Sequence, residues 1–316
     1  MRHILIYCIG SDELVYNIQQ LENALKQTKI HFALSEPMNR HTSFKIGGLA
    51  DIFAAVENEQ ELKALKVLCD TYGVPMLVIG KGSNLLVSDK GIDGVVVTTE
   101  PMNTIAVEDC RITAGAGATL SSLCSAAATA GLTGLEFACG IPGSVGGAVY
   151  MNAGAYGGEM KDVIESVTAL MPDGEIRTFE NSELGLSYRK SIFTQNGATV
   201  ISAVFKLTQG QTEKIRDDMA DILRRRKEKQ PLEYPSAGST FKRPEGNFAG
   251  ALIEQCGLKG KSVGGAMVSR KHAGFVINTG SASCADVRTL IKKVQESVEG
   301  ETGIFLETEV LFVGRE

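Results

Sequence analysis

The stretch LEFACGIPGSVGGAVYMNAGAYGGEM, residues 135–160, is rich in glycine and almost free of charge. Glycine loses more conformational freedom on folding than any other residue, so such a cluster predicts backbone shapes that a side chain would block. Two interpretations are open: several tight turns coincide here, or the backbone lies close against a large ligand. The sequence on either side helps to decide between them.

Before this stretch, strands and helices alternate from about residue 50, which is typical of an α/β or α+β protein. Strands are expected at 74–80, 85–88 and 91–99, and 110–132 is expected to hold a strand, a glycine turn and an alanine-rich helix. Another helix is expected over 57–73, with Gly73 as its end. Its apolar face has helical spacing and consists of Leu62, Leu65, Val67, Leu68 and Tyr72.

After this stretch, a hairpin is expected over 163–179, where PDGE supplies the turn, and a strand over 198–207. A charged helix follows over 208–231 and ends at Pro231, and we place a domain boundary just before it. Its predicted inner face consists of Ile215, Met219, Ile222 and Leu223. The rest is expected to contain a strand at 238–244, a helix at 248–257, strands at 261–269 and 272–280, a helix at 284–303 and a strand at 305–313.

The bulk composition limits the class of protein. The chain has 316 residues, a formal net charge of −5 and a pI near 5.6, which argues against a nucleic-acid or membrane-surface partner. Its seven cysteines include no C-x-x-C pair, which favours buried thiols in a reducing cytosol over a disulfide framework or a zinc site, and no metal is expected. The apolar run in residues 1–14 is too short to span a membrane and lacks a clear cleavage site. We expect a strand or a poorly ordered extension there, and a cytoplasmic protein.

Three further segments resemble phosphate-binding motifs. GKGSNL at 80–85 and GAGATL at 115–120 match half of the dinucleotide fingerprint G-x-G-x-x-G, but leucine stands where the third glycine belongs. CGLKGKS at 256–262 resembles a Walker A loop, but Gln255 takes the place of its first glycine and the segment follows a helix. Neither of these nucleotide-binding folds is therefore expected.

The loop at 80–85 keeps the physical features of an anion site. Gly80 and Gly82 allow a close backbone approach, and the N–H groups of the loop, with Ser83, can point at an anion beyond the end of a strand. An ordinary tight turn is the alternative for this loop alone. Three glycine-rich loops in one segment favour an extended anionic cofactor lying against residues 135–160. The residues alone carry the interpretation no further.

Six longer motifs run collinearly from about Arg40 to Val313: GKGSNLLVSDKGIDGVVV, GLEFACGIPGSVGGAVYMNAGAYGGEM, LSYRKSIF, AGSTFKRP, LIEQCGLKGKSVGGAMVSRKHAGFVIN and LETEV. Together they resemble the UDP-N-acetylenolpyruvoylglucosamine reductase (MurB) family. The short segment 193–200 resembles the shorter subclass of this family, which lacks an inserted unit with a tyrosine that covers the substrate.

The resemblance implies an α+β protein: a vanillyl-alcohol-oxidase-type (PCMH-type) FAD-binding fold of two α/β subdomains, followed by a smaller α+β substrate domain. The first subdomain would occupy 1–97 together with an N-terminal extension, and the second would occupy 98–210. The substrate domain would occupy 211–316 and end in a catalytic strand.

The resemblance also implies a reaction. NADPH would reduce non-covalently bound FAD and leave, and the enolpyruvyl ether of UDP-N-acetylglucosamine would then be reduced to UDP-N-acetylmuramate for peptidoglycan synthesis. Hydride would pass from FAD N5 to the enolpyruvyl group, and Ser239 would supply the proton. Two alternatives are open: an FAD-dependent oxidase of the same cofactor fold acting on an alcohol or sugar, and a non-catalytic module that binds flavin or a nucleotide sugar. No nucleic-acid partner and no membrane insertion are expected.

Site residues follow from the same motifs. Arg189 of SYRKSIF would stabilise the substrate carboxylate and the charged intermediate, because the guanidinium fork matches a carboxylate. Glu309 of LETEV would assist it, with Glu307 as a rival that would face the same side of one strand. Substrate contacts are implied for Tyr188, Arg189, Lys229, Lys242 and Arg243, the last standing where some relatives carry asparagine. Cofactor contacts are implied for Thr42, Gly80, Lys81, Gly82, Ser83, Asn84, Leu85, Gly115, Gly117, Gly140, Ile141, Pro142, Gly143, Ser144, Gly146 and Gly147.

Overall fold

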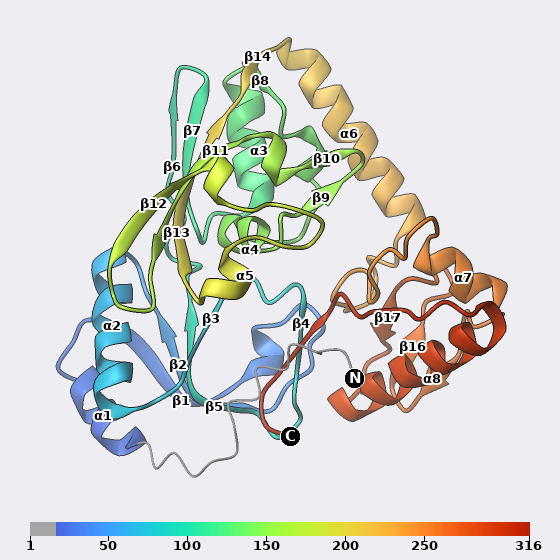
Figure 1. Ribbon diagram of the computed structural model, residues 1–316, viewed down its shortest axis with the longest axis horizontal. Helices are drawn as coiled ribbons and strands as arrows, with labels where there is room; N and C mark the ends of the chain where they lie inside the picture. Colours follow the sequence, from blue (N-terminus) through green and yellow to red (C-terminus); the bar gives the residue numbers. More distant parts are fainter. Residues whose placement is uncertain (1–16) are drawn as a thin grey trace.

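A computed structural model describes residues 17–316, and the expected strand or extension in residues 1–14 lies outside them. The described chain forms three parts, each with its own sheet and helices (Figure 1). Helices and strands are mixed throughout, so the α+β prediction is confirmed. None of the helices in 17–316 combines the length and the apolar character needed to cross a bilayer. The same residues contain no group of three or more His, Cys, Asp or Glu side chains that could hold a metal ion.

The first part is a four-stranded sheet in the order β1-β2-β5-β3. Its strands are β1 (His31–Pro37), β2 (Leu49–Ala55), β3 (Met76–Ile79) and β5 (Ile92–Thr98). β1 runs antiparallel to β2, whereas β2, β5 and β3 are parallel. The carboxyl ends of β3 and β5 therefore share one edge of the sheet, and the loop at 80–85 begins there, as ligand loops do in open α/β sheets.

Two helices pack on this sheet, α1 (Ile18–Leu25) and α2 (Glu59–Tyr72). The Asn58 side chain caps the start of α2 by accepting from the Glu61 amide, and Gly73 ends it with a φ of 64°. The predicted helix is thus confirmed, but its predicted face is wrong at Val67, which is 52% exposed. The strand predicted at 74–80 forms as β3, which is mostly half-buried because it lies at the sheet edge.

The second part is a five-stranded antiparallel sheet in the order β12-β11-β13-β7-β6. Its strands are β6 (Ile105–Glu108), β7 (Arg111–Gly115), β11 (Ile164–Leu170), β12 (Ile176–Glu180) and β13 (Thr199–Lys206). The predicted hairpin is confirmed as β11–β12, and Gly174 takes a φ of 85° in its turn. The helices of this part are α3 (Leu120–Thr129), α4 (Val145–Tyr150) and α5 (Phe193–Asn196).

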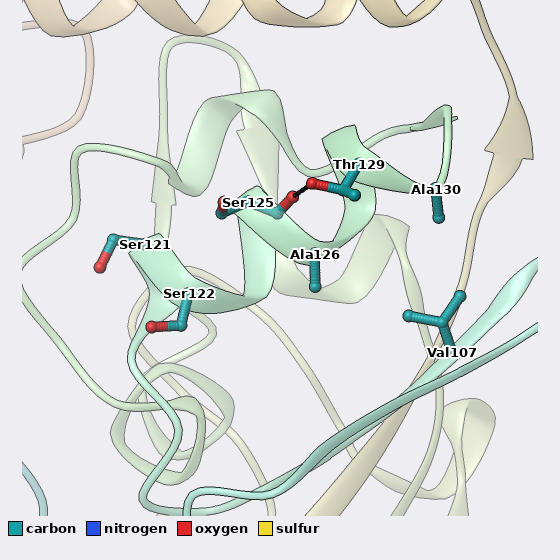
Figure 2. Close-up of a pocket in the computed structure, with 7 residues that line it drawn as sticks. All are labelled: Val107, Ser121, Ser122, Ser125, Ala126, Thr129 and Ala130. Carbon is teal, nitrogen blue, oxygen red and sulfur yellow. Dashed lines mark hydrogen bonds between the residues drawn. The ribbon is translucent and has the colours of Figure 1, made fainter.

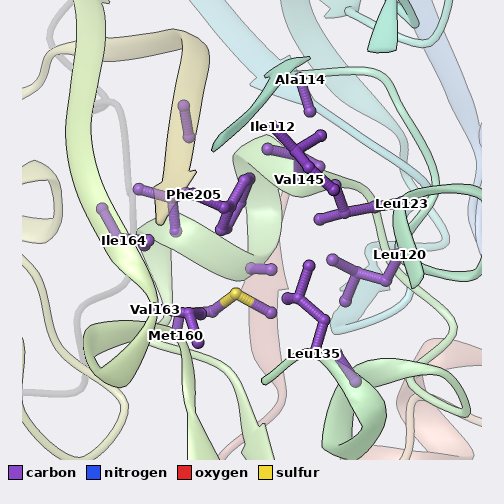
Figure 3. Packing of buried hydrophobic residues seen from close by; sticks show 14 of the residues in the cluster. Ile112, Ala114, Leu120, Leu123, Leu135, Val145, Met160, Val163, Ile164 and Phe205 are labelled. Atoms are coloured by element: carbon purple, nitrogen blue, oxygen red, sulfur yellow. The ribbon is translucent and has the colours of Figure 1, made fainter. Parts of the chain in front are cut away.

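The core of the second part lies between the sheet and the glycine-rich segment. Figure 3 shows Met160 beside Val163, with Phe205 of β13 and Leu135 around them. Burying an apolar side chain of this size contributes about 1.5–3 kcal/mol. Residues 135–160 are therefore a structural element of this part and not only a surface loop.

The third part begins with α6 (Thr212–Lys229), the long helix that leads away from the second part in Figure 1. It contains the sheet β15-β16-β17 and two further helices. These elements are α7 (Ala249–Gln255), β15 (Ser262–Val263), β16 (Ala266–Val268), β17 (Val276–Asn278) and α8 (Cys284–Thr302). The predicted helices are confirmed, but Leu223 of the predicted inner face of α6 is 46% exposed.

The two strands predicted at 238–244 and 305–313 are mostly wrong. Phe241 and Thr308 form an isolated bridge, and regular strand begins only at β18 (Leu311–Val313). β18 returns to the first part and pairs in parallel with β4 (Leu85–Val87). Arg315 completes this return by contacting Asp51 and by donating to Asp93 at 2.5 Å. The division of the chain at residues 97 and 210 stays a prediction.

Short elements complete the described chain. They are η1 (Met38–Arg40), β8 (Leu132–Thr133), η2 (Glu136–Ala138), β9 (Gly154–Ala155), β10 (Gly158–Glu159), η3 (Met160–Asp162), η4 (Asn181–Glu183) and β14 (Thr208–Gln209). Between α5 and β13 the chain passes only through the turn at Gly197, so no further unit is inserted there.

Candidate functional site

Arg189 and Glu309 meet although 120 positions separate them in the sequence. Arg189 Nε donates to Glu309 Oε1 at 2.6 Å, and the two side chains are 19% and 12% exposed. Arg189 comes from the second part and Glu309 from the segment that leads into β18. The contact therefore lies where the C-terminal segment passes from the third part back to the first.

The pKa of Glu309 is set by opposing effects. Burial raises the pKa of its carboxyl above the ordinary value, and the positive charge and hydrogen bond of Arg189 partly offset this rise. Weaker lowering contributions come from Tyr188 and Lys242. A carboxyl in such a place stays protonated to higher pH than one in water, so it can donate a hydrogen bond more readily.

The backbone of Glu309 is held from two sides. Its amide donates to Thr240 O at 2.8 Å, and its carbonyl accepts from Asn84 Nδ2 at 3.1 Å. Ser239 precedes Thr240 and is half-buried, and no hydrogen bond to its hydroxyl is found within residues 17–316. The three predicted catalytic residues thus come from segments that are joined by direct hydrogen bonds, with Asn84 of the predicted cofactor loop beside them.

Glu307 does not share the environment of Glu309. Its side chain is 70% exposed and pairs with Lys242 Nζ at 3.2 Å. The expectation that both carboxylates face the same side of one strand is wrong, because residues 305–310 are not regular strand. The structure therefore separates the two candidates: Glu309 is the one that contacts Arg189.

The predicted substrate residues divide into two groups. Tyr188 Oη accepts from the Arg243 amide at 3.0 Å, and the Arg243 guanidinium lies 4.5 Å from the centre of the Phe248 ring. Tyr188 and Lys242 both act on Glu309, and Arg243 is connected to this group through Tyr188. Lys229, in contrast, is exposed at the end of α6, and no contact joins it to this group in the described part of the chain.

The predicted cofactor loop leaves backbone donors free. No protein acceptor is found within residues 17–316 for the amides of Lys81, Gly82, Ser83 and Asn84. The loop is held from behind, because Gly82 has a φ of 56° and its carbonyl accepts from Ser43. Thr42 is buried beside it, and Leu85 continues the loop into β4. A row of unpaired amides in such a nest suits an anion such as a phosphate.

Ser144 supplies a second unpaired donor close to this loop. Its Oγ is buried and has no hydrogen-bond partner among the described residues. A Cβ on Gly80 would collide with this hydroxyl, so Gly80 is required for the two segments to approach. A buried hydroxyl without a partner is costly, and a bound polar group would satisfy it.

The glycines of the predicted cofactor set serve two purposes. Side chains on one subset would strike the backbone or side chains of the protein itself: Gly80, Gly82, Gly115, Gly117, Gly140 and Gly146. At Gly143 and Gly147, in contrast, a Cβ would meet nothing closer than 3.6 Å and 3.7 Å. Only the latter two would accept a Cβ at ordinary van der Waals distances, next to the half-buried Ile141 and the exposed Pro142. The free amides, Ser144 and these two unobstructed backbone positions fit an extended anionic cofactor such as FAD.

Two hollows are found near these segments. One of about 200 Å³ is lined by Lys81, Glu100, Asn103, Gly117, Ala118, Thr119 and Ser122, and an ion pair of 3.1 Å joins Lys81 to Glu100. The other, of about 650 Å³, is a shallow groove between the outer face of α3 and Val107 (Figure 2). None of the three predicted catalytic residues lines this groove, so its size does not mark the reacting centre.

Sequence reasoning missed the supports of the Arg189 turn. Asn152 and Ser191 are both buried and bind backbone carbonyls in and near that turn. Neither belongs to a pattern that periodicity can reveal. The one available signal is that Asn152 stands in the glycine-rich stretch, where asparagine is among the few side chains that accept a positive φ.

Comparison with known proteins agrees with this geometry. Residues 230–313 match the model of the UDP-N-acetylenolpyruvoylglucosamine reductase C-terminal domain, and residues 50–180 match the FAD binding domain model. A UDP-N-acetylenolpyruvoylglucosamine reductase of Lachnoclostridium phytofermentans is 50% identical over 94% of this chain and 97% of its own length. One of Agathobacter rectalis is 53% identical over 88% of this chain and 93% of its own. The crystal structure of the reductase from Thermus caldophilus superposes with a TM-score of 0.77 at 39% identity, covering 90% of this chain and 99% of that one.

Proposed function

This chain belongs to the UDP-N-acetylenolpyruvoylglucosamine reductase family, and we propose that it reduces the enolpyruvyl ether of UDP-N-acetylglucosamine to UDP-N-acetylmuramate as an FAD-dependent oxidoreductase. The observation that carries the proposal is the buried Arg189–Glu309 pair. The Glu309 amide donates to the carbonyl of Thr240, the residue that follows Ser239. The Glu309 carbonyl accepts from Asn84, which belongs to the loop with the free amides. Charge stabilisation, a proton donor and an anion site are thereby brought together.

FAD, when bound, supplies the reducing equivalents, which NADPH delivers to it. The residues that would hold it are the free amides of 81–84, Ser144, and the unobstructed backbone positions at Gly143 and Gly147. We place the reaction in the cytoplasm and assign NADPH and the nucleotide sugar as the small-molecule partners.

Arg189 binds the carboxylate of the enolpyruvyl group. The reduction places negative charge on the carboxylate side of the substrate, and a fixed guanidinium stabilises this charge without reorganisation. In the structure the guanidinium donates to Glu309. The substrate carboxylate therefore competes with Glu309 for Arg189.

Glu309 responds to this competition by taking up a proton. Burial already raises its pKa, and Arg189 is the largest influence that lowers it. Once the guanidinium turns to the substrate, the largest influence that lowers the pKa of Glu309 weakens, and the neutral carboxyl is favoured further. A neutral Glu309 donates a hydrogen bond to the charged intermediate instead of repelling it.

Ser239 transfers the proton that completes the product. Its hydroxyl is half-buried and is not engaged by any protein acceptor among residues 17–316. A serine is a weak acid in water, so the transfer depends on close placement against a strongly basic carbon. The hydrogen bond from the Glu309 amide to the Thr240 carbonyl, next to Ser239, supports such a placement.

An FAD-dependent oxidase acting on an alcohol or sugar is the second candidate. Such an enzyme removes hydride from its substrate and has no use for a guanidinium aimed at a carboxylate. The Arg189–Glu309 pair therefore favours the reductase. The distinguishing experiment is anaerobic: the reduced holoenzyme is mixed with the enolpyruvyl substrate, and prompt reoxidation of the flavin supports the reductase, whereas reoxidation by air alone supports the oxidase.

A further inference from the structure

The turn that carries Arg189 contains a strained backbone conformation. Ser187 and Lys190 bridge each other through two backbone hydrogen bonds of 3.1 Å and 3.0 Å, and Arg189 takes a φ of 55° between them. A positive φ costs a non-glycine residue about 1 kcal/mol or more. Such a turn keeps its shape only if its surroundings hold it.

Asn152 is the side chain that holds it. Its Nδ2 donates to Ser187 O at 3.0 Å and to Glu159 Oε2 at 2.7 Å, and its Oδ1 accepts from the Lys161 amide at 2.9 Å. The residue is 1% exposed and itself has a φ of 42°. Both the nitrogen and the oxygen of its amide are thus engaged, and among the bonds of residues 17–316 the one to Ser187 links it to the turn.

A second anchor ties the same turn to the same segment. Ser191 Oγ donates to Tyr150 O at 2.7 Å, and Ser191 is also 1% exposed. Tyr150 is the last residue of α4, which contains Gly147, and Asn152 lies two residues after it. The segment around α4, which contains the predicted cofactor position Gly147, is therefore also bonded to the turn that carries the guanidinium.

We propose that Asn152 is a positioning residue that fixes the turn of Arg189 and so aims its guanidinium at Glu309 and at the substrate carboxylate. The part of the inference that concerns the substrate carboxylate rests on the proposed function. The part that concerns the Arg189–Glu309 contact rests on the geometry of the structure alone. Asn152 touches neither partner of that contact; it acts through Ser187.

Two variants of the full-length holoenzyme test the Ser187 bond. Asn152→Gly keeps the positive φ and removes the whole amide with its three hydrogen bonds. In the double variant Asn152→Asp with Glu159→Gln, the glutamine amide donates to the new carboxylate and the Lys161 amide keeps its acceptor, while the donor to Ser187 O is lost. This variant also loses the Glu159–Lys161 ion pair of 3.2 Å, so it is compared with Glu159→Gln alone. Asn181→Ala is the matched control, because Asn181 Nδ2 also donates to two carbonyls, of Lys161 and Ile164, but not to the turn.

Flavin reoxidation by the enolpyruvyl substrate should slow about tenfold or more in both Asn152 variants, the scale of one lost buried hydrogen bond. Flavin reduction by NADPH should stay within about twofold, and the double variant should recover thermal stability without recovering reoxidation. Asn181→Ala should lower stability and leave reoxidation unchanged. Equal loss of both half-reactions, or normal reoxidation in Asn152→Gly, would overturn the proposal.

A structural measurement separates this proposal from the proposed function. If the wild-type flavin is not reoxidised by the substrate, the proposed function fails, and the role of Asn152 is then decided by ¹³C NMR titration of the Glu309 carboxyl. Its pKa should rise in Asn152→Gly, because the guanidinium that lowers it has moved away. An unchanged pKa would show that Asn152 does not position Arg189.

Discussion

Asn84 donates from Nδ2 to the carbonyl oxygen of Glu309 at 3.1 Å, and its own carbonyl accepts from the Leu311 amide at 2.9 Å. Asn84, a residue of the predicted cofactor loop, therefore binds the backbone of the two residues on either side of Val310. Ligand binding at the loop and the position of the Glu309 carboxyl are mechanically linked by these two bonds.

Asn84→Ala should consequently impair the chemistry as well as the cofactor site. We expect kcat to fall about tenfold, since the lost hydrogen bond frees the backbone that carries Glu309. Steady-state kinetics at saturating FAD measures this. Asn247→Ala is the control, because Asn247 Nδ2 binds only the nearby Glu245 carbonyl, and an equal fall there would contradict the link.

The glycines of the cofactor set should respond differently to alanine. Gly147→Ala adds a Cβ within α4 without a clash, so it should stabilise the cofactor-free protein by about 0.5–1 kcal/mol while weakening FAD binding. Gly117→Ala should instead destabilise the protein, because its Cβ would collide with the backbone carbonyl oxygen of Thr99. Denaturant unfolding without FAD and flavin titration measure the two effects. An unaltered FAD affinity in Gly147→Ala would mean that the cofactor does not lie against this face.

Activity should depend on pH through Glu309. The carboxyl acts in its protonated form, and burial raises its pKa, so activity is present below that pKa and is lost as pH rises through it. Glu309→Gln cannot titrate, so its profile should lack this limb while its kcat is lower by about 10²-fold, the scale of a changed charge-stabilising donor. A limb that persists unchanged in Glu309→Gln would assign the titration to another group.

Arg315 should contribute to stability because it fastens β18 to the first part. Its pKa is raised by its hydrogen bonds and ion pairs with Asp93 and Asp51, although partial burial opposes this. Arg315→Ala should lower the free energy of unfolding by about 1–2 kcal/mol after allowance for solvent screening. Arg111→Ala removes a two-bond contact to Glu165 on the surface of the second sheet and should cost clearly less. Equal losses would contradict a special role for the returning strand.

The sequence predicts the local elements better than the way they meet. α2, the β11–β12 hairpin and α8 carry their own signals in apolar spacing, the Asn58 cap and the turn at Gly174. The strand expected at 238–244 and the first part of the strand expected at 305–313 did not form regular strand; these segments meet only at an isolated bridge between Phe241 and Thr308. No local pattern specifies such a long-range contact.

The same limit applies to the site. Family motifs single out Arg189, Ser239 and Glu309 as a prediction, whereas periodicity wrongly puts Glu307 and Glu309 on one face. Burial and the Arg189 contact, which depend on the whole fold, distinguish them. The glycines illustrate the reverse case. A sequence cannot show that most of them accommodate the protein's own backbone or side chains, or that Gly143 and Gly147 would accept a Cβ without a clash.

The most direct test of the account follows flavin absorbance without oxygen. Wild-type holoenzyme and Ser239→Ala are reduced with NADPH and then mixed with UDP-N-acetylglucosamine enolpyruvate. We predict prompt reoxidation in the wild type, and equally fast reduction but strongly slowed reoxidation in Ser239→Ala. A wild-type flavin that stays reduced until air is admitted would contradict the proposed reaction.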